Sequence, residues 1–320
     1  MSPRTRRLVL LLTLVGTVVG LAPPANAAVV VTAAPYVDMG AWPTPSMSDM
    51  AVKGKLKSFT MGFVTAWGCK ASWFGAYDPR TGWQADEIAK IRAAGGDVKV
   101  SFGGASGIEL AQNCSTVTSL ANEYDAVVKA YKLNYIDLDI EGAAVADPAS
   151  IQRRSQALAV VQQRNPGLKI SLTLPVLPEG LDANGLNVVK AAKNAGVALD
   201  LVNIMAMDYY YPVADQGDRA IAAARATQAQ IKSLYGLADA AAWKKIGVTP
   251  MLGVNDSRNE IFYTSDATQL VNFAKSVHLG MLSFWEMTRD RNACNGSLVN
   301  CTNVPQQPYE FSKIFGGYTG

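Results

Sequence analysis

The sequence predicts an α/β fold of the TIM-barrel class, a (β/α)8 barrel built as a single domain. Two features predict it: short apolar runs typical of buried parallel strands recur eight times, and amphipathic helical stretches separate them. An open, doubly wound sheet has the same alternation. That alternative has less support, because no glycine-rich dinucleotide turn follows the first strand.

The eight predicted strands are short runs rich in aliphatic and aromatic residues. They cover residues 34–39, 59–66, 98–102, 135–141, 168–174, 201–207, 246–251 and 281–285. Between them, apolar residues recur at i, i+3 and i+4, which is the spacing of one helix face. The pattern is clearest over residues 117–131, and the other predicted helices cover residues 83–94, 149–163, 183–194, 218–234, 267–276 and 308–314.

The first 27 residues have the composition of a secretory signal peptide. Arg4, Arg6 and Arg7 precede an apolar run that is too short to span a bilayer, and small residues at positions 25–27 suit a signal peptidase. The two adjacent arginines also resemble a twin-arginine signal, so both the Sec and the twin-arginine route stay open. We therefore expect a signal peptide over residues 1–27, a barrel domain over residues 28–320, and a secreted, extracellular protein.

The formal charge of the whole chain is +3, and three of its arginines lie in the expected signal peptide, so the remainder is near neutral. A near-neutral domain has no basic surface for nucleic acid or an anionic membrane. We expect neither partner, and a monomer. No cysteine or histidine cluster has the spacing of metal ligands, and we expect no metal and no cofactor.

The four cysteines are compatible with disulfides in an oxidising compartment. Three pairings are possible, and the sequence alone does not choose among them. Cys294 and Cys301 bracket one polar loop. Pairing them would leave Cys69 with Cys114, each of which follows a predicted strand.

Three carboxyl side chains alternate with aliphatic residues over the predicted strand 135–141. Asp137, Asp139 and Glu141 are two positions apart, which places them on one face of the strand. An exposed acidic edge strand is the alternative interpretation. The run lies mid-chain between helical stretches, however, where a parallel strand is covered on both faces and carboxylates are costly unless they are functional. The spacing therefore favours a catalytic site.

The carboxyl ends of barrel strands meet at one rim, where the active sites of such barrels lie. In the predicted strand 135–141, the fourth in the chain, the acids lie in the carboxyl-terminal half. Unusual residues also end other strands: Gly103 and Gly104 end the third, Asp208 and Tyr209 end the sixth, and Trp285 ends the eighth. Their convergence on one rim strengthens the catalytic interpretation.

With these motifs the chain resembles glycoside hydrolase family 18, the chitinase family. Residues 134–141 match the D-x-x-D-x-D-x-E motif of its fourth strand, with Asn134 in the first position. Residues 101–104 match S-x-G-G, and residues 205–208 match M-x-Y-D except that Met207 replaces the tyrosine. Residues 101–106, 174–178 and 247–251 are most similar to the bacterial and archaeal branch that includes the catalytic domains of Pyrococcus chitinases.

The resemblance implies a substrate-assisted retaining mechanism, in which the 2-acetamido group of the sugar is the nucleophile. It assigns Glu141 as the acid/base and Asp139 as the residue that holds the acetamido N–H. Asp137 lies deeper and is expected to share a proton with Asp139. Asp208 is expected to support the acetamido group or Asp139.

Met207 lacks the hydroxyl group of the family tyrosine, and another residue has to supply it. We expect Tyr209 to do so, because it lies on the same strand face two residues later; Tyr210 is less well placed by strand parity.

The resemblance also implies a set of substrate-binding residues. Trp285 would form an apolar floor under the cleaved sugar, because sugar faces stack on aromatic rings. Other expected contacts are Met205, Ser101, Gly103, Gly104, Asn255 and Asp256. Trp42, Trp67 and Trp73 follow the first two strands and either extend the groove or pack within loops.

These features predict a secreted chitinase that hydrolyses β-1,4 linkages between N-acetylglucosamine units. Residues 251 and 281 are only 30 positions apart, so we expect no α+β insertion between strands seven and eight, and an open groove that favours endo-acting cleavage. An endo-β-N-acetylglucosaminidase on N-glycans and a non-hydrolytic chitin-binding lectin are the alternatives. The only histidine, His278, closes a predicted helix and is interpreted as structural, which excludes a Ser-His-Asp hydrolase.

Overall fold

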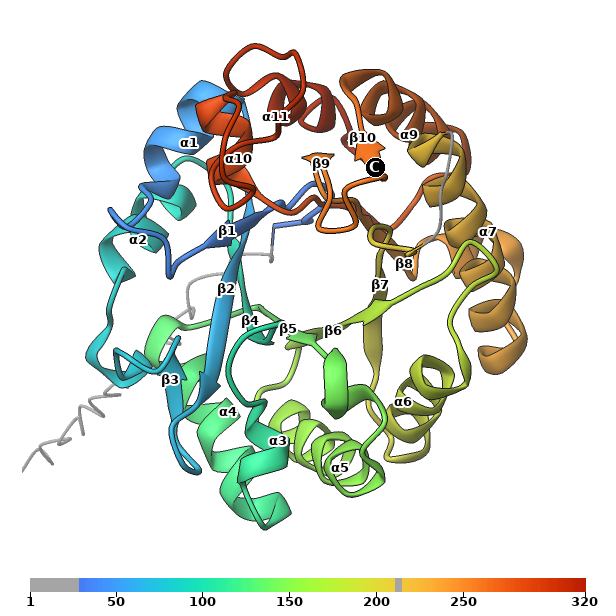
Figure 1. Ribbon diagram of the computed structural model, residues 1–320. Helices are drawn as coiled ribbons and strands as arrows, with labels where there is room; N and C mark the ends of the chain where they lie inside the picture. Colours follow the sequence, from blue (N-terminus) through green and yellow to red (C-terminus); the bar gives the residue numbers. More distant parts are fainter. Residues whose placement is uncertain (1–28, 211–214) are drawn as a thin grey trace, which may run out of the picture.

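The computed structural model describes residues 29–210 and 215–320, and the expected signal peptide lies outside this range. Its centre is a barrel of parallel strands surrounded by helices (Figure 1). In chain order the barrel strands are β1 (Tyr36–Asp38), β2 (Phe59–Ala66), β4 (Val98–Gly103), β5 (Tyr135–Asp139), β6 (Lys169–Pro175), β7 (Leu199–Met205), β8 (Ile246–Thr249) and β11 (Met281–Leu282). Each pairs in parallel with the next. The predicted (β/α)8 architecture is confirmed.

The first and last strands pair with each other and close the barrel. Ala33 and Leu282 form a parallel bridge. The backbone N–H groups of Ala34 and Tyr36 donate to the carbonyl oxygens of Leu282 and Phe284, each at 3.0 Å. Closure gives the strands one common axis, with all their carboxyl ends at the same rim.

Helices form the outer layer (Figure 1). They are α1 (Met47–Gly54), α2 (Ala85–Ala93), α3 (Leu110–Asn113), α4 (Val117–Tyr131), α5 (Pro148–Arg164), α6 (Ala183–Asn194), α7 (Gln216–Tyr235), α8 (Asp239–Trp243), α9 (Thr264–Val277), α10 (Met287–Asn292) and α11 (Glu310–Phe315). The helix predicted over residues 117–131 is confirmed at both ends. Helices α1, α3, α8 and α10 have no predicted counterpart, because eight residues or fewer show too little periodicity to be recognised. Within the described ranges, no helix has the length and apolarity needed to cross a membrane.

Two short strand pairs add to the barrel. β3 (Ala71–Trp73) turns back antiparallel on β2, with Trp73 opposite Val64. Between β8 and β11 the chain forms the two-stranded antiparallel sheet of β9 (Gly253–Val254) and β10 (Ile261–Phe262), followed by α9.

Two disulfides are formed, Cys69–Cys114 and Cys294–Cys301, which is one of the three possible pairings.

The barrel strands have two different faces. Outward-facing residues such as Ile136, Leu138 and Ile140 are fully buried beneath the helices. The inward-facing residues of the middle and upper layers are polar, and almost inaccessible to solvent; they include Ser101, Asp137, Ser171, Thr173, Asn203 and Thr249. Buried polar groups are costly unless they are paired, so these side chains are expected to have hydrogen-bond partners inside the barrel.

Candidate active site

The three acids of the predicted fourth strand lie at increasing height in the barrel interior. Asp137 and Asp139 are on β5, with exposed fractions of 1% and 5%. Glu141 follows the strand and is partly exposed; the 3-10 helix Gly142–Val145 begins directly after it. The carboxyl groups therefore extend from the middle of the barrel to its rim.

Two glycines allow β4 and its loop to approach these acids. The φ angle of Gly103 is 103°, and a Cβ there would lie 2.0 Å from the carbonyl oxygen of Asp139. A Cβ on Gly104, with φ 86°, would lie 2.7 Å from the ring of Phe63. Both positions therefore require glycine. Gly104 lines a cavity beside the acids, whereas Gly103 is buried against β5; the expected substrate contact at Gly103 is wrong.

Asp137 accepts hydrogen bonds from four hydroxyl groups. Tyr36 and Ser101 donate to Oδ2 at 2.8 and 2.7 Å, Thr173 donates to Oδ1 at 2.9 Å, and Ser171 donates to the same oxygen. These donors satisfy the buried oxygens of Asp137, as a buried polar group requires. Ser101 is thus a partner of Asp137 and does not line the cavity described below, contrary to the expectation that it contacts substrate.

A chain of side-chain hydrogen bonds extends this arrangement across the barrel. The hydroxyl of Thr249 donates to the amide oxygen of Asn203 at 2.9 Å, and the amide nitrogen of Asn203 donates to Thr173 at 3.0 Å. Thr173 in turn donates to Asp137, so each donor points toward that carboxylate. A Cβ on Gly247 would lie 2.7 Å from the amide oxygen of Asn203, so glycine leaves room for the chain.

Asp139 lies one layer higher in a different environment. Its Oδ1 is buried and has no hydrogen-bond partner among the described residues. Burial raises the pKa of Asp139 well above its ordinary value, and the charges of Glu141 and Asp137 raise it further. None of the hydrogen bonds that Asp137 makes in residues 29–210 and 215–320 reaches Asp139. Asp139 Oδ1 therefore lacks the hydroxyl donors that surround Asp137, and the shared proton stays a prediction.

Glu141 and Asp208 have raised pKa values for the same main reason. Burial raises the pKa of Glu141 to about 7, and the charge of Asp208 contributes to this rise. Burial also raises the pKa of Asp208 to about 6, although the backbone N–H of Ser257 donates to it at 2.7 Å. Glu141 consequently keeps its proton up to near-neutral pH, as a general acid must.

These carboxyl groups line a cavity of about 190 Å³ at the rim. Its lining residues are Tyr36, Phe63, Ala105, Asp139, Glu141, Thr173, Met205, Met207, Asp208, Thr249, Met251, Asp256 and Trp285. A second cavity of about 190 Å³ shares Asp139 and Glu141 and continues along Gly104. A larger cavity of about 680 Å³ lies at the amino ends of the strands, beside Lys169 and His278, and none of the three acids lines it. We therefore assign the site to the rim.

An aromatic cluster forms one wall of the rim cavity. Trp285 stacks on Phe63, with ring centroids 5.5 Å apart and planes inclined by 21°, and Tyr36 lies 5.9 Å from Trp285. Trp285 is thus placed where the sequence predicts it. Phe63 is not predicted, because a register shift in β2 between Met61 and Val64 breaks the alternation of the strand.

The chain leaves the barrel after Met205, the last residue of β7, and strand parity ends there. Met205 and Asp208, two of the expected site residues, line the cavity together with Met207. Tyr209 is only 3% exposed, belongs to the hydrophobic core and is not among the lining residues. The expectation that Tyr209 supplies the missing hydroxyl group is therefore wrong.

Tyr210 is the next tyrosine in this turn. Asp208 and Tyr210 have left-handed φ angles of 48° and 62°, so the alternation of a strand does not apply to them. Tyr210 is 83% exposed and is not among the residues that line the rim cavity. Its pKa is raised first by its slight burial and then by the charges of Asp208, Asp256 and Glu141.

Two buried residues that follow β8 support this turn. Asn255 is 1% exposed; its amide donates to two backbone carbonyls, and its oxygen accepts from the N–H of Asp208 at 3.4 Å. Glu260 is fully buried and accepts from the N–H groups of Tyr209 and Tyr210 at 2.9 and 2.7 Å. The expected sugar contact at Asn255 is therefore wrong, since Asn255 positions Asp208, whereas its neighbour Asp256 lines the cavity.

The remaining tryptophans lie outside the cavity. Trp42 and Trp67 are 89% and 71% exposed, so neither packs within a loop. Trp73 is fully buried and its Nε1 donates to the hydroxyl of Tyr131 at 2.8 Å, which makes it structural and rules it out as an extension of the groove.

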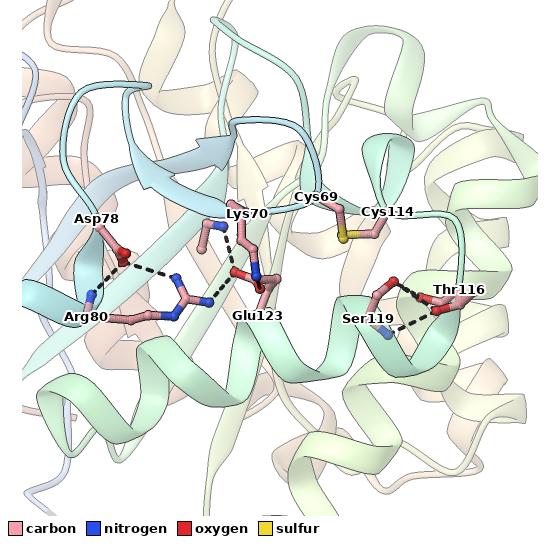
Figure 2. A network of polar contacts seen from close by, with 9 residues as sticks. Cys69, Lys70, Asp78, Arg80, Cys114, Thr116, Ser119 and Glu123 are labelled. Atoms are coloured by element: carbon pink, nitrogen blue, oxygen red, sulfur yellow. Dashed lines mark hydrogen bonds and ion pairs between the residues drawn. A yellow bond between two sulfur atoms is a disulfide. The ribbon is translucent and has the colours of Figure 1, made fainter.

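Figure 2 shows how the turn after Trp67 is fixed. The disulfide Cys69–Cys114 ties the turn between β2 and β3 to the end of α3. Glu123 on α4 accepts from the backbone N–H of Ala71 at 2.9 Å, from Lys70 at 3.1 Å, and from Arg80. Trp67 therefore projects from an anchored turn.

Comparisons with known proteins agree with the motifs. Residues 41–258 match the family model described as Glycosyl hydrolases family 18. The chain is 36% identical over 306 residues to the probable bifunctional chitinase/lysozyme of Escherichia coli (strain K12), a match that covers 89% of this chain and 34% of that protein. It is 37% identical over 283 residues to endochitinase 11 of Metarhizium anisopliae, which covers 84% of this chain and 54% of that protein. The chain thus spans about a third and about half of the length of these two relatives.

A solved structure is similar over almost its whole length. Active domain 2 of the thermostable chitinase from Pyrococcus furiosus, determined as catalytic site mutants complexed with chito-oligosaccharides, is 32% identical and superposes with a TM-score of 0.84, covering 93% of this chain and 97% of that one. The resemblance to the Pyrococcus catalytic domains is confirmed. The chain therefore belongs to glycosyl hydrolases family 18.

Proposed function

We propose that the protein is a chitinase that hydrolyses β-1,4 linkages between N-acetylglucosamine units by substrate-assisted retaining catalysis. The observation that carries this proposal is the ordered set of carboxyl groups along β5. Asp137 is surrounded by hydroxyl donors, burial raises the pKa of Asp139 well above its ordinary value, and burial raises the pKa of Glu141 at the rim to about 7. Family membership and the aromatic wall at Trp285 support the same assignment.

Glu141 is the acid/base of the proposed reaction. Its proton passes to the glycosidic oxygen while the acetamido carbonyl oxygen of the same sugar attacks C1, which breaks the C1–O bond and forms an oxazolinium ion. The ionised Glu141 then takes a proton from a water molecule. The water oxygen attacks C1 from the side of the departed group and breaks the bond between C1 and the acetamido oxygen, which restores the acetamido group and retains the configuration.

Asp139 is proposed to hold the acetamido group. Its buried Oδ1 has no partner among the described residues, and such an acceptor is satisfied when a ligand N–H donates to it. A sugar without the acetamido group would lack both the nucleophile and this donor.

Tyr210 is proposed to supply the hydroxyl group that Met207 lacks. Tyr210 is exposed, and the charges of Asp208 and Glu141 contribute to the rise of its pKa. Trp285, stacked on Phe63, is proposed as the floor under the cleaved sugar, since the apolar face of a pyranose ring packs on an aromatic ring.

We propose an open groove and endo-acting cleavage. Residues 250–280 contain the small sheet of β9 and β10 and helix α9, a segment too short to add a further domain as a wall. Trp42 and Trp67 are exposed outside the cavity and are proposed to contact sugar units of a long chain. Chain ends are not needed to enter such a groove.

Secretion is proposed from the sequence of residues 1–27, followed by one catalytic barrel over residues 28–320. The two disulfides support it, because disulfides persist in oxidising compartments outside the cytosol. Expression with residues 1–27 intact, followed by recovery of cleaved protein from the medium, tests this proposal; uncleaved protein inside the cells overturns it.

The activity is tested by incubating the protein with chitin oligosaccharides, with polymeric chitin and with a high-mannose glycopeptide. Shorter chitin oligosaccharides with retained anomeric configuration are the expected products, and Glu141→Gln should bind the same oligosaccharides without cleaving them. Release of glycan from the glycopeptide alone would make the protein an endo-β-N-acetylglucosaminidase. Binding without turnover by the wild type would make it a lectin.

A further inference from the structure

Exposed aromatic side chains gather beside the rim cavity, on the part of the chain that follows β2. Phe74 and Tyr77 are 37% and 44% exposed. Trp67 lies close to them, since a Cβ on Gly75 would lie 3.8 Å from its indole ring. We call Trp67, Phe74 and Tyr77 the aromatic platform. Large apolar side chains that are exposed together, and not singly, commonly mark a binding surface.

The rings of the platform rest on a layer of tryptophans. Tyr77 stacks on the partly buried Trp83, with ring centroids 4.9 Å apart and planes inclined by 14°. The ring of Phe74 meets both of these rings edge to face, with its centroid 5.6 Å from each. Trp83 in turn packs on the fully buried Trp73 at 5.6 Å. These contacts hold the exposed rings in fixed positions.

The backbone that carries Tyr77 is also held in place. The backbone N–H of Trp73 donates to the carbonyl oxygen of Tyr77 at 2.8 Å and closes the turn between them. Directly after this turn, Asp78 forms an ion pair at 3.1 Å with Arg80, which also pairs with Glu123 on α4 (Figure 2). A surface that is rigid before binding loses little conformational entropy on binding.

The platform adjoins the wall of the rim cavity. The backbone N–H of Phe74 donates to the carbonyl oxygen of Phe63 at 3.1 Å, and Phe63 is the cavity residue that stacks on Trp285. Phe74 also lies beside the loop after β1, because a Cβ on Gly40 would lie 3.6 Å from its ring. Aromatic side chains thus extend from the cavity wall onto the surface next to it.

The backbone of Phe74 favours a smaller residue. Its φ angle of 38° is left-handed, a conformation that residues with a Cβ rarely adopt and that glycine adopts freely. The turn therefore does not explain the phenyl ring, and a third of that residue is exposed to solvent.

We propose that the aromatic platform is a binding surface for insoluble chitin, separate from the catalytic cavity. The identity of the polymer rests on the proposed function. The apolar faces of pyranose rings pack on aromatic rings, and the platform presents such rings next to the cavity. Its exposed rings are uncharged, and the neighbouring Lys70, Asp78 and Arg80 are already in ion pairs, which suits a neutral polymer. The surface would keep the protein on the polymer while the cavity acts on one chain.

The first test measures adsorption to insoluble chitin in a Glu141→Gln background, in which cleavage does not alter the polymer. Tyr77→Ala and Phe74→Gly should each raise the dissociation constant about fivefold, the effect of one stacked ring. Glycine suits the left-handed backbone at position 74, and Tyr77→Phe keeps the ring and should bind like the parent. About 1 M NaCl should leave adsorption unchanged, because the contact is uncharged.

Tyr263→Ala is the matched control. Tyr263 is also 44% exposed, but it lies at the start of α9, across the barrel from β3 (Figure 1). Its loss should leave adsorption unchanged.

The second test measures Tyr77→Ala and Phe74→Gly with Glu141 intact. Their kcat/KM on a soluble chitin disaccharide substrate should equal that of the wild type, whereas product release from insoluble chitin should fall about fivefold at low protein concentration. Unchanged adsorption of both folded variants overturns the proposal, as does adsorption that salt abolishes or an equal loss in Tyr263→Ala.

The two proposals fail in different ways. If the wild type adsorbs to chitin through these rings but cleaves no chitin oligosaccharide, the proposed function fails and the platform stands. If the wild type cleaves soluble oligosaccharides but does not adsorb to insoluble chitin, the platform fails and the proposed function stands.

Discussion

Replacing Asp208 by asparagine tests the electrostatic control of the general acid. The pKa of Glu141 is raised to about 7 by burial and then by the charge of Asp208, whose own pKa of about 6 leaves it mostly ionised at neutral pH. Both residues line a cavity of about 190 Å³. A sphere of that volume has a diameter of roughly 7 Å, which we take as the separation of the two carboxylates. At an effective dielectric constant of about 20, two unit charges at that distance repel by roughly 2 kcal/mol. This energy corresponds to about 1.5 pKa units. Water at the open mouth reduces this to about one unit.

The sign of the effect follows from the charge. Asparagine keeps the shape of the side chain and removes a negative charge, so the proton on Glu141 is held less tightly and the pKa of Glu141 falls. The alkaline limb of the kcat profile, which reports loss of that proton, should move about one unit toward lower pH. At pH 7 the protonated fraction of Glu141 would fall from about a half to about a tenth, which lowers the rate roughly fivefold from this cause alone.

The assay measures initial rates on a chromogenic chitin oligosaccharide from acidic to alkaline pH. Because Asp208 also lines the cavity, the position of the alkaline limb is the criterion, and the absolute rate is not. Asp86→Asn, an exposed aspartate in the first turn of α2, is the matched control and should leave the limb unmoved. An alkaline limb of Asp208→Asn at the wild-type position, or at higher pH, would refute the coupling of the two carboxyl groups.

Three other changes probe the turn, the outer groove and the disulfides. Tyr210→Phe should lower kcat on chitin oligosaccharides about 100-fold by removing a donor to the acetamido oxygen, whereas Tyr209→Phe should leave kcat near the wild-type value. Trp67→Ala should raise KM for long chitin chains about fivefold and leave KM for a disaccharide substrate unchanged, because one stacked ring contributes about 1 kcal/mol. The two disulfides span 45 and 7 residues, and the loop-closure entropy that a disulfide removes grows with this separation. Replacing both Cys69 and Cys114 by serine should therefore lower the free energy of unfolding, measured in urea, by about 4 kcal/mol. Replacing both Cys294 and Cys301 should lower it by about 2 kcal/mol.

Each of these predictions has an opposite outcome. A larger loss of kcat in Tyr209→Phe than in Tyr210→Phe would return the hydroxyl role to Tyr209. Equal changes in KM for short and long substrates would remove Trp67 from the outer groove. Equal losses of stability for the two disulfides would show that loop closure is not their main contribution.

The fold and the central acids could be predicted because they depend on regular periodicity. Along β5 every second residue faces inward, so the alternation of Asp137 and Asp139 with aliphatic residues gives their direction correctly. Trp285 was predictable because it follows a strand at the carboxyl rim, where side chains face the site. The parallel order of the strands follows from the alternation of strands and helices.

The residues that were missed lie where that periodicity stops. The bulge in β2 turns Phe63 into the cavity, and two left-handed residues after β7 end the alternation by which Tyr209 was expected to face the acids. Glu260 is a different case. It supports this turn through two backbone N–H groups, and no spacing in the sequence links it to a turn some 50 residues earlier.

Strand register explains why two aspartates two positions apart have different surroundings. The pairing of β4, β5 and β6 puts Ser101 and Ser171 on either side of Asp137, so hydroxyl donors are available at its level. One layer higher, Asp139 lies between Gly103, which has no side chain, and Thr173, whose proton is already donated to Asp137. Burial without donors raises the pKa of a carboxyl group, as it does for Asp139. Gly103 therefore does more than make room for the Asp139 carbonyl: because it offers no side-chain donor, it does not oppose the rise in the pKa of Asp139.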